Sequence, residues 1–226
     1  MCFSATASFS AAAFLIPFGV YTAQRSVKTC PAYLGFSIFP IGFGLQQLAE
    51  GINWLLLPGQ SFAISAATLG FLFFSHFFWL LVVPAAAWLC EGEALRKKIL
   101  FSLMLAGGFL GFSFFIPLLV NDGWFSATIR YDAIYYSITK IYDGFISTGP
   151  MLLIYVLIIL VPLLVSSKRD VRIFGILLGL SMIVGLVYFK YAFVSIWCYF
   201  AAMLSCSILF IILRASNQTK KTFSRI

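Results

Sequence analysis

Long apolar stretches separated by short polar segments make up nearly the whole chain. A helix that crosses a bilayer needs roughly 20 mostly apolar residues, and seven such stretches follow one another along the sequence. We place them at Phe3–Ala23, Ala32–Leu57, Phe62–Cys90, Ile99–Val120, Phe145–Val165, Val171–Phe189 and Tyr191–Leu213. The pattern predicts an all-α fold, a polytopic transmembrane bundle of seven helices. It assigns residues 1–214 to one transmembrane domain and residues 215–226 to a short basic cytoplasmic tail.

Charge is scarce and unevenly placed along the chain. Only 10% of the residues are charged, against about a quarter in soluble domains. Twelve of the fifteen Lys and Arg residues follow the first, third and fifth predicted helices or lie in the tail, and Arg130, Lys140 and Lys190 fall on the other side. Because short cytoplasmic loops are enriched in basic residues, we expect the N-terminus outside and the C-terminus in the cytoplasm.

The net charge of +8 therefore lies mostly on a cytoplasmic rim that faces anionic lipid head groups. We expect the lipid bilayer to be a partner of this chain. We expect no nucleic-acid partner, because no basic stripe is interleaved with residues that read bases.

Residues 121–144, NDGWFSATIRYDAIYYSITKIYDG, form the only sizeable external segment in this topology. Ile134, Ile138 and Ile141 recur at helical spacing, whereas ATIRYDAIYYS is also compatible with a short β-hairpin. The Trp and Tyr residues are typical of an interfacial aromatic belt, and the alternative is a lid or ligand-gating loop. In either case we expect the segment to lie over the outer mouth of the bundle.

The second predicted helix carries a charge where a charge is costly. A stripe on one face of this helix contains Gln46, Gln47, Glu50, Asn53 and Trp54. Lipid cannot hydrogen-bond such groups, so the stripe must face the bundle interior or a wet cavity. A carboxylate costs about 2.5–3.5 kcal/mol at that depth on insertion scales. We therefore expect Glu50 to be protonated, paired or solvated; the alternative is a neutral Glu50 bonded to Gln46 and a neighbouring backbone.

The single histidine, His76, lies in the third predicted helix. Folding the second and third helices across the PGQ turn puts Thr68, not His76, level with Glu50. By helical rise His76 then lies roughly 9–12 Å deeper. We expect it to be a deeper relay or a packing residue rather than a direct partner of Glu50. The candidate ligand-binding residues are Glu50, Gln46, Gln47, Asn53, Trp54 and His76.

The sequence lacks the residues that several known functions of seven-helix membrane proteins require. A retinal Schiff base needs a lysine in the last helix, and residues 191–213 contain none. Bis-histidine haem binding and zinc-dependent intramembrane hydrolysis both need more than one histidine. The sequence also lacks a Gly-Lys-Ser/Thr phosphate loop, a Gly-x-Ser-x-Gly elbow and a Cys-x-x-Cys pair. We therefore expect no metal site, and the sequence identifies neither a cofactor nor a catalytic residue. The sequence alone does not decide whether Cys2 and Cys198 form a disulfide at the outer face.

Three segments carry a resemblance to a known family: the opening MCFSATASFSAA, QQLAEGINW and SIWCYFAAMLS. They resemble an uncharacterised bacterial membrane-protein family whose members begin Met-Cys-Phe-Ser-Ala and span the membrane about seven times. The resemblance covers most of the chain and implies a bacterial inner-membrane location. It draws attention to Met1–Ser4, Gln46, Glu50, Trp54 and Trp197, and it implies no mechanism.

Our leading hypothesis is an inner-membrane protein that binds a small molecule, a lipid or a proton around Glu50, in its outer half, for transport or sensing. It predicts that Glu50→Gln abolishes function or ligand retention without unfolding the protein. The alternative is an intramembrane enzyme that acts on a lipid or isoprenoid with Glu50 or His76 as acid or base, which predicts a bell-shaped pH profile lost in His76→Ala. A third hypothesis, a structural subunit of a membrane complex, predicts indifference to both substitutions.

Overall fold

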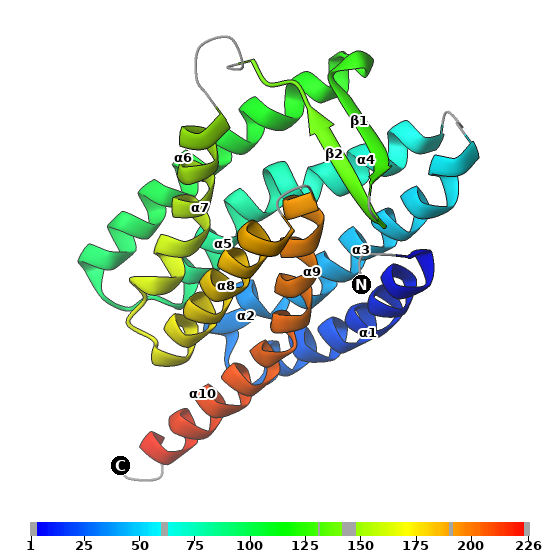
Figure 1. Cartoon of the computed structure of the whole chain (residues 1–226). Coiled ribbons are helices and arrows are strands. Elements are labelled where there is room, and N and C mark those ends of the chain that lie inside the picture. The colour runs from blue at the N-terminus through cyan, green and yellow to red at the C-terminus, as the bar shows by residue number, and fades with distance from the viewer. Residues whose placement is uncertain (1–3, 60–62, 131, 142–147, 190–191, 224–226) are drawn as a thin grey trace.

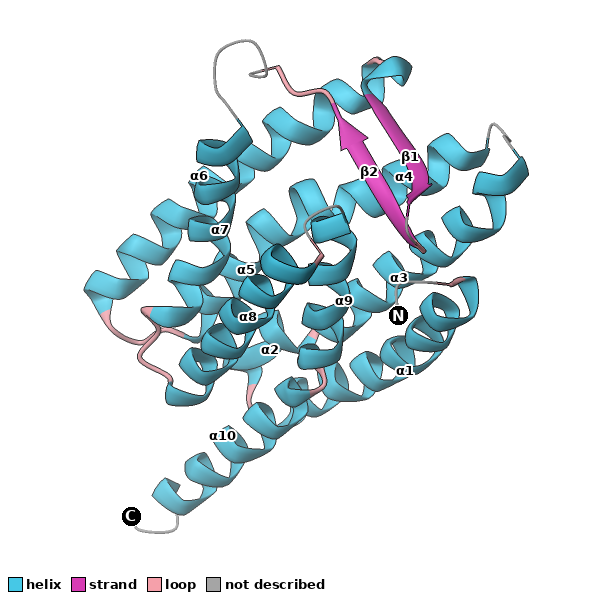
Figure 2. Cartoon of the chain, viewed as in Figure 1, coloured by secondary structure: helices cyan, strands magenta, loops and turns pink. Residues whose placement is uncertain are grey.

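Helices account for almost all of the chain in a computed structural model, which describes residues 4–59, 63–130, 132–141, 148–189 and 192–223. Figure 1 and Figure 2 show long helices packed side by side, with a β-hairpin at one end. The predicted all-α bundle is thus confirmed, and each of the seven apolar stretches contains helix over its described residues.

Several of the seven stretches are built from more than one helical segment. The first stretch is α1 (Ala5–Thr29), and the fourth is α6 (Ala94–Val120). The second consists of the 3-10 turn Pro31–Tyr33, α2 (Leu34–Ser37), α3 (Phe39–Leu56) and the 3-10 turn Leu57–Gly59. The third consists of α4 (Ala63–Phe73), the π-helical turn Phe74–Phe78 and α5 (Trp79–Cys90). The last three are α7 (Thr148–Leu164), α8 (Arg169–Tyr188), and α9 (Phe193–Ser205) with α10 (Ser207–Phe223).

Helix length and composition show that this is a membrane protein. Five helical stretches of the described chain are long and apolar enough to cross a bilayer: Ala5–Thr29, Ile64–Cys90, Ala94–Val120, Arg169–Tyr188 and Phe193–Asn217. Gly149–Leu164 is apolar but shorter, and α3 is made less apolar by its polar stripe. Large apolar side chains also point outward from most helices, as a lipid-facing surface requires.

Close helix packing fixes which face of α3 is turned inward. A Cβ on Gly44 would lie 2.6 Å from the Ile16 side chain of α1, and a Cβ on Gly19 would lie 2.6 Å from the Ile41 backbone nitrogen. Glycine at such crossings lets two helices approach closely. At the start of α1, Ser4 Oγ accepts a hydrogen bond from the Ala7 backbone N–H at 3.2 Å, which gives that member of the opening signature a capping role.

The external segment of the sequence analysis folds as a β-hairpin. β1 (Phe125–Arg130) pairs antiparallel with β2 (Ala133–Ile138), and Arg130 lies opposite Ala133. Asp132 in the two-residue turn has φ = 57°, a left-handed conformation that Asp adopts more readily than most residues. The hairpin interpretation of this segment is confirmed. Its helical spacing does not mark one buried face, because Ile134 is buried whereas Ile141 lies outside β2 and is 52% exposed. We call this end of the bundle the hairpin end.

At the other end, which we call the basic end, one buried carboxylate holds two loops together. Glu91, between α5 and α6, is only 3% exposed. Its Oε2 accepts a hydrogen bond from the Ser167 backbone N–H at 2.8 Å, and its Oε1 accepts bonds from Gly92 and Glu93 at 2.9 and 3.0 Å. Burial raises the pKa of Glu91, but these hydrogen bonds outweigh it and lower the pKa to about 2.

The last apolar stretch continues as a helix into the basic tail. α9 is separated from α10 at Cys206, whose backbone N–H bonds back to the Met203 carbonyl at 3.2 Å. α10 then runs on to Phe223, ten residues past the expected end of the last apolar stretch at Leu213. Figure 1 shows it projecting from the basic end of the bundle. Much of the segment 215–226 is therefore helical.

Candidate functional site

The polar stripe of α3 faces the interior, as its pattern indicates. Gln46, Gln47, Glu50 and Asn53 are each no more than 1% exposed. The opposite face carries exposed apolar side chains, namely those of Leu45, Leu48, Ile52 and Leu55. α3 therefore contributes a line of buried polar groups that must find hydrogen bonds inside the protein.

Glu50 joins α3 to α9. Gln47 Nε2 donates to Glu50 Oε2 at 2.9 Å, and Ser195 Oγ donates to Glu50 Oε1. Gln46, which the sequence suggested as a bonding partner of Glu50, instead accepts a hydrogen bond from Trp79 Nε1 at 2.8 Å. Gln47, three residues before Glu50, therefore bonds its carboxylate, whereas Gln46, four residues before it, is turned toward α5.

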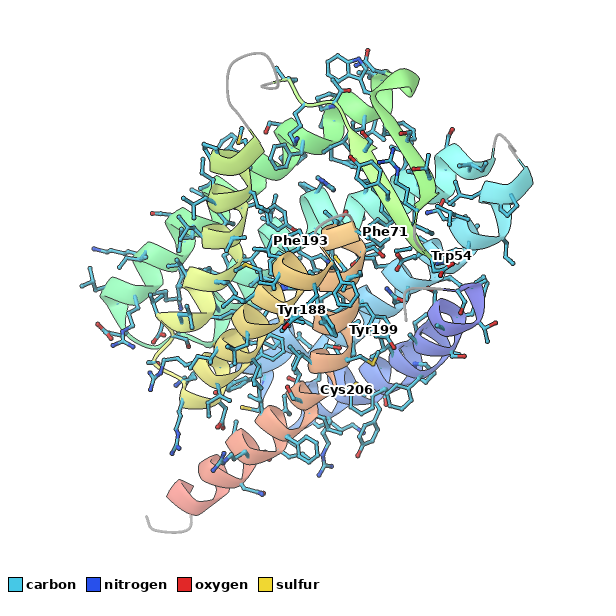
Figure 3. The ribbon with its side chains drawn as sticks, viewed as in Figure 1. Trp54, Phe71, Tyr188, Phe193, Tyr199 and Cys206 are labelled. Carbon is cyan, nitrogen blue, oxygen red and sulfur yellow. The ribbon has the colours of Figure 1, made fainter. Side chains whose placement is uncertain are left out.

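Asn53 joins α3 to α4 and to the hairpin. Thr68 Oγ1 donates to Asn53 Oδ1 at 3.0 Å, and Asn53 Nδ2 donates to the Tyr136 hydroxyl at 3.2 Å. The Tyr136 ring stacks on Phe71, with ring centroids 4.1 Å apart and an interplanar angle of 4°. Figure 3 labels Phe71 and Trp54 at the hairpin end, where this contact lies. The hairpin is thus fixed to the stripe through one tyrosine.

Some buried polar atoms of this region have no hydrogen-bond partner in the described structure. They are Ser8 Oγ, Gln46 Nε2, Gln47 Oε1 and Trp54 Nε1. The Cys198 thiol lies against the Gln46 amide. Gln47 and Trp54 are seven residues apart, so they share one face of α3. Native proteins rarely leave such atoms unpaired, so this face of α3 is the least satisfied part of the stripe.

A cavity of about 560 Å³ lies between the hairpin and the bundle. Its volume falls in the range of about 300–1,000 Å³ that holds small-molecule ligands. Residues from β2 and the chain after it, from the π-helical turn, and from α6 to α9 form the wall. They are Ser75, His76, Phe114, Tyr135, Tyr136, Ser137, Ile138, Lys140, Met151, Leu152, Tyr155, Leu186, Phe193, Val194, Trp197 and Cys198.

The π-helical turn shapes the wall around His76. The Trp79 backbone N–H donates to the Phe74 carbonyl, five residues back, so the Ser75 carbonyl loses its usual α-helical donor. The Tyr155 hydroxyl of α7 donates to that carbonyl at 2.6 Å, while Ser75 Oγ lies 2.8 Å from His76 Nδ1. Single π turns inside α-helices are frequent at functional sites, and this one borders the cavity.

The structure divides the candidate residues between two adjoining places. His76 lines the cavity, whereas Glu50, Gln46, Gln47, Asn53 and Trp54 do not. Asn53 reaches the cavity wall through Tyr136, and Glu50 reaches it through Ser195, the neighbour of Val194. The candidate set is thus not one cluster around Glu50 but a buried stripe and a cavity that share a wall.

Sequence reasoning missed most of the cavity wall. Tyr155 carries the single hydroxyl between Met151 and Val165, where all other residues are apolar, and that isolation was the available signal. The external segment 121–144 contributes Tyr135, Tyr136 and Lys140 to the wall. The sequence allowed two interpretations of this segment, an interfacial aromatic belt or a lid. Trp197 was singled out only through the family resemblance. Its indole Nε1 donates to the Leu178 carbonyl at 3.3 Å, which fixes the ring at the cavity wall.

Two ionisable nitrogen groups belong to the described part of the cavity wall, those of His76 and Lys140, and the Lys140 ammonium acts on the His76 ring electrostatically. Among the described residues, no group of three His, Cys, Asp or Glu side chains comes together in a way that could hold a metal ion. The described cysteines Cys30, Cys90, Cys198 and Cys206 are free, and Cys2 lies outside the described residues.

The fold and the buried polar groups together define a polytopic helical membrane protein with a partly open cavity at one end. The chain belongs to the family of unknown function DUF6629, which it matches over residues 1–224. The resemblance to an uncharacterised family is therefore confirmed. No curated protein and no solved structure matches the chain.

Proposed function

We propose that this membrane protein binds a small molecule in the cavity under the hairpin and serves transport or sensing. The observation that carries the proposal is the cavity itself: about 560 Å³, walled by five helices and a hairpin, with polar groups converging on an apolar space. Pockets of this form are the default ligand sites of proteins.

The proposed setting is a bacterial inner membrane with the hairpin end outside. Basic residues support this orientation, because Arg96, Lys168 and Arg172 lie in the loops and helix starts at the basic end. α6 runs from that end to the hairpin, so the cavity occupies the opposite half of the bundle. A ligand would then enter from the outer side or from the outer leaflet.

The hairpin is the proposed lid of the site. Its Tyr136 both lines the cavity and bonds Asn53, so movement of the hairpin away from the cavity breaks a contact to the stripe. The apolar side of the hairpin packs Ala133 against Ile196 of α9 and against Ala192, which immediately precedes that helix. In this proposal the stripe around Glu50 holds α3 and α9 together behind the cavity and registers whether the lid is closed.

Ligand retention tests the proposal with a matched pair of neighbouring residues on α7. Leu152 lines the cavity, whereas Leu153 is 59% exposed on the outer surface of the helix. Leu152→Trp fills the cavity, and Leu153→Trp adds the same bulk to the lipid-facing side. Native mass spectrometry of the gently extracted proteins is the measurement.

We expect a discrete bound mass on the unaltered protein and on Leu153→Trp, and its loss from Leu152→Trp. A bare protein mass throughout, or the same bound mass in both variants, would refute binding in this cavity. Thermal unfolding of the two variants distinguishes loss of ligand from loss of fold.

A further inference from the structure

We propose that a groove between α8 and α10, at the basic end, binds one anionic phospholipid of the surrounding bilayer. This site is separate from the cavity under the hairpin and does not depend on the function proposed for that cavity. Three observations carry it: the place of the groove on two membrane-spanning stretches, its division into a charged and an apolar end, and the excess of positive charge around the charged end.

The groove lies where α10 diverges from the bundle. α10 begins after the break at Cys206 and projects from the basic end (Figure 1), which leaves an opening against α8. Both helices belong to stretches that are long and apolar enough to cross a bilayer, Arg169–Tyr188 and Phe193–Asn217. The lining includes Asp170, Ile173 and Leu177 of α8 and Phe210, Ile211 and Arg214 of α10.

The groove has a charged end and an apolar end. Asp170 lies in the first turn of α8, and Leu177 follows two helical turns, or about 10 Å, further along. Arg214 joins Asp170 at the charged end. Below this pair the exposed lining is apolar: Ile173 is 42%, Leu177 40% and Phe210 74% exposed. The arrangement matches a phospholipid, whose charged head group lies above its hydrocarbon chains.

Positive charge is in excess around the charged end. Arg214 Nη1 donates to Asp170 Oδ1 at 3.1 Å, and a guanidinium has five N–H donors, so this pair leaves donors for a phosphate. Asp170 is the last acidic residue in the sequence. Basic pockets between transmembrane helices bind anionic head groups. The other basic residues at the start of α8 and after Arg214 are Lys168, Arg169, Arg172, Lys220, Lys221 and Arg225.

The size of the groove favours a bilayer lipid over a soluble ligand. Its volume of about 180 Å³ is below the range of about 300–1,000 Å³ in which pockets enclose small molecules. The groove therefore holds only part of its occupant. A phospholipid fits this condition, because the rest of its hydrocarbon stays in the bilayer and exposes no apolar surface to water.

Native mass spectrometry of the whole chain, released from nanodiscs, tests the site. The nanodiscs contain equal amounts of phosphatidylglycerol and phosphatidylcholine with the same acyl chains, and the two lipids differ in mass. Ile173 and Ile176 form a matched pair on α8: they are 42% and 51% exposed, but only Ile173 lines the groove. Arg214 and Arg25 form a second pair, because both are exposed and only Arg214 lines the groove.

We expect the unaltered protein to retain one phosphatidylglycerol per chain in preference to phosphatidylcholine. Ile173→Trp should abolish this retention, and Ile176→Trp should leave it unchanged. Arg214→Gln should lower the preference for phosphatidylglycerol about fivefold, as expected for one basic residue at a membrane surface. Arg214→Lys should restore the preference, and Arg25→Gln should not alter it. Thermal unfolding of each variant separates loss of the lipid from loss of the fold.

Four results would overturn the proposal. Equal effects within either matched pair would assign the lipid preference to the charge of the whole basic end. Loss of the lipid in Leu152→Trp would place it in the cavity under the hairpin. A dimer mass in place of the lipid complex would assign the groove to a second copy of the chain. Absence of any retained lipid would remove the site, and it would leave the proposed function of the cavity standing wherever a separate ligand mass is lost in Leu152→Trp.

Discussion

Glu50 is a carboxylic acid with no solvent exposure, and both of its oxygens accept hydrogen bonds from side chains of the bundle. Its importance at the residue scale lies in what those bonds connect. Gln47 Nε2 belongs to the same helix, whereas Ser195 Oγ belongs to α9, next to the cavity wall. A residue of this kind is costly in a membrane, so its presence is better explained by a task than by stability.

We predict that Glu50→Gln keeps the fold but weakens ligand retention. Glutamine has the same shape, so its stability cost should stay within about 1 kcal/mol, whereas Glu50→Leu leaves two buried donors unsatisfied and should cost about 1–3 kcal/mol or more. Thermal unfolding and native mass spectrometry of the two variants check this. Full ligand retention in Glu50→Gln would assign Glu50 to helix packing alone.

A second prediction at this scale concerns Glu91. The pKa of its carboxyl falls from an ordinary value of 4.5 to about 2 in the folded protein. A lowered folded-state pKa means that the stabilisation is fully present above about pH 4.5 and is lost as the pH falls toward 2. Glu91→Gln should therefore cost about 1–3 kcal/mol at neutral pH, with a smaller difference from the unaltered protein in acid.

Glu93, two residues on, supplies the control for Glu91. Its carboxylate pairs with Arg96 at 2.6 Å, and both side chains are substantially exposed. Exposed pairs of this kind contribute little, so Glu93→Gln should change the unfolding temperature only slightly at any pH. Unfolding measured between pH 3 and pH 7 compares the two variants. A pH-independent loss in Glu91→Gln would show that packing, not ionisation, is what Glu91 contributes.

At the element scale, the π-helical turn Phe74–Phe78 connects local backbone geometry to the cavity. An α-helix running unbroken from Ala63 to Cys90 would satisfy the Ser75 carbonyl internally. In the π turn the Ser75 carbonyl accepts a hydrogen bond from the Tyr155 hydroxyl of α7 instead. One hydroxyl therefore fixes the spacing of α7 from the turn that carries His76, and so the width of the cavity at that point.

We predict that Tyr155→Phe destabilises the protein by about 1–3 kcal/mol, because a buried carbonyl loses its donor, and that it also weakens ligand retention. Tyr188→Phe on α8 is the matched control: Tyr188 is 73% exposed and labelled in Figure 3, and its substitution should change neither property. Thermal unfolding and bound mass are the measurements. Equal behaviour of the two variants would show that the Tyr155 bond does not hold the wall.

The hairpin shows where sequence reasoning at the element scale reaches its limit. Its residues carry both a helical spacing and a strand pattern, and the choice depends on contacts far along the chain. Tyr136 stacks on Phe71, and Ala133 packs against α9. Such long-range contacts decide between local alternatives, and they cannot be read from residues 121–144 alone.

At the scale of the whole molecule, apolar stretch lengths predicted the number and order of the helical stretches, because the bilayer sets a length that sequence records directly. The inward face of α3 was also predictable, because lipid cannot hydrogen-bond the polar side chains between Gln46 and Asn53. The cavity was not predictable. It arises where β2, the π turn and α9 meet. Its wall residues Tyr155 and Lys140 lie far from His76 in the sequence and reach it only through the tertiary packing of the fold.

The central claim is that a ligand occupies the space between the hairpin and the bundle. The most direct test is an experimental density map of the gently extracted protein in nanodiscs. We predict a discrete density inside the cavity, in contact with the described wall residues His76, Tyr155 and Trp197. A well-defined map in which side chains close that space, or in which it stays empty while the protein carries a bound mass, would contradict the account.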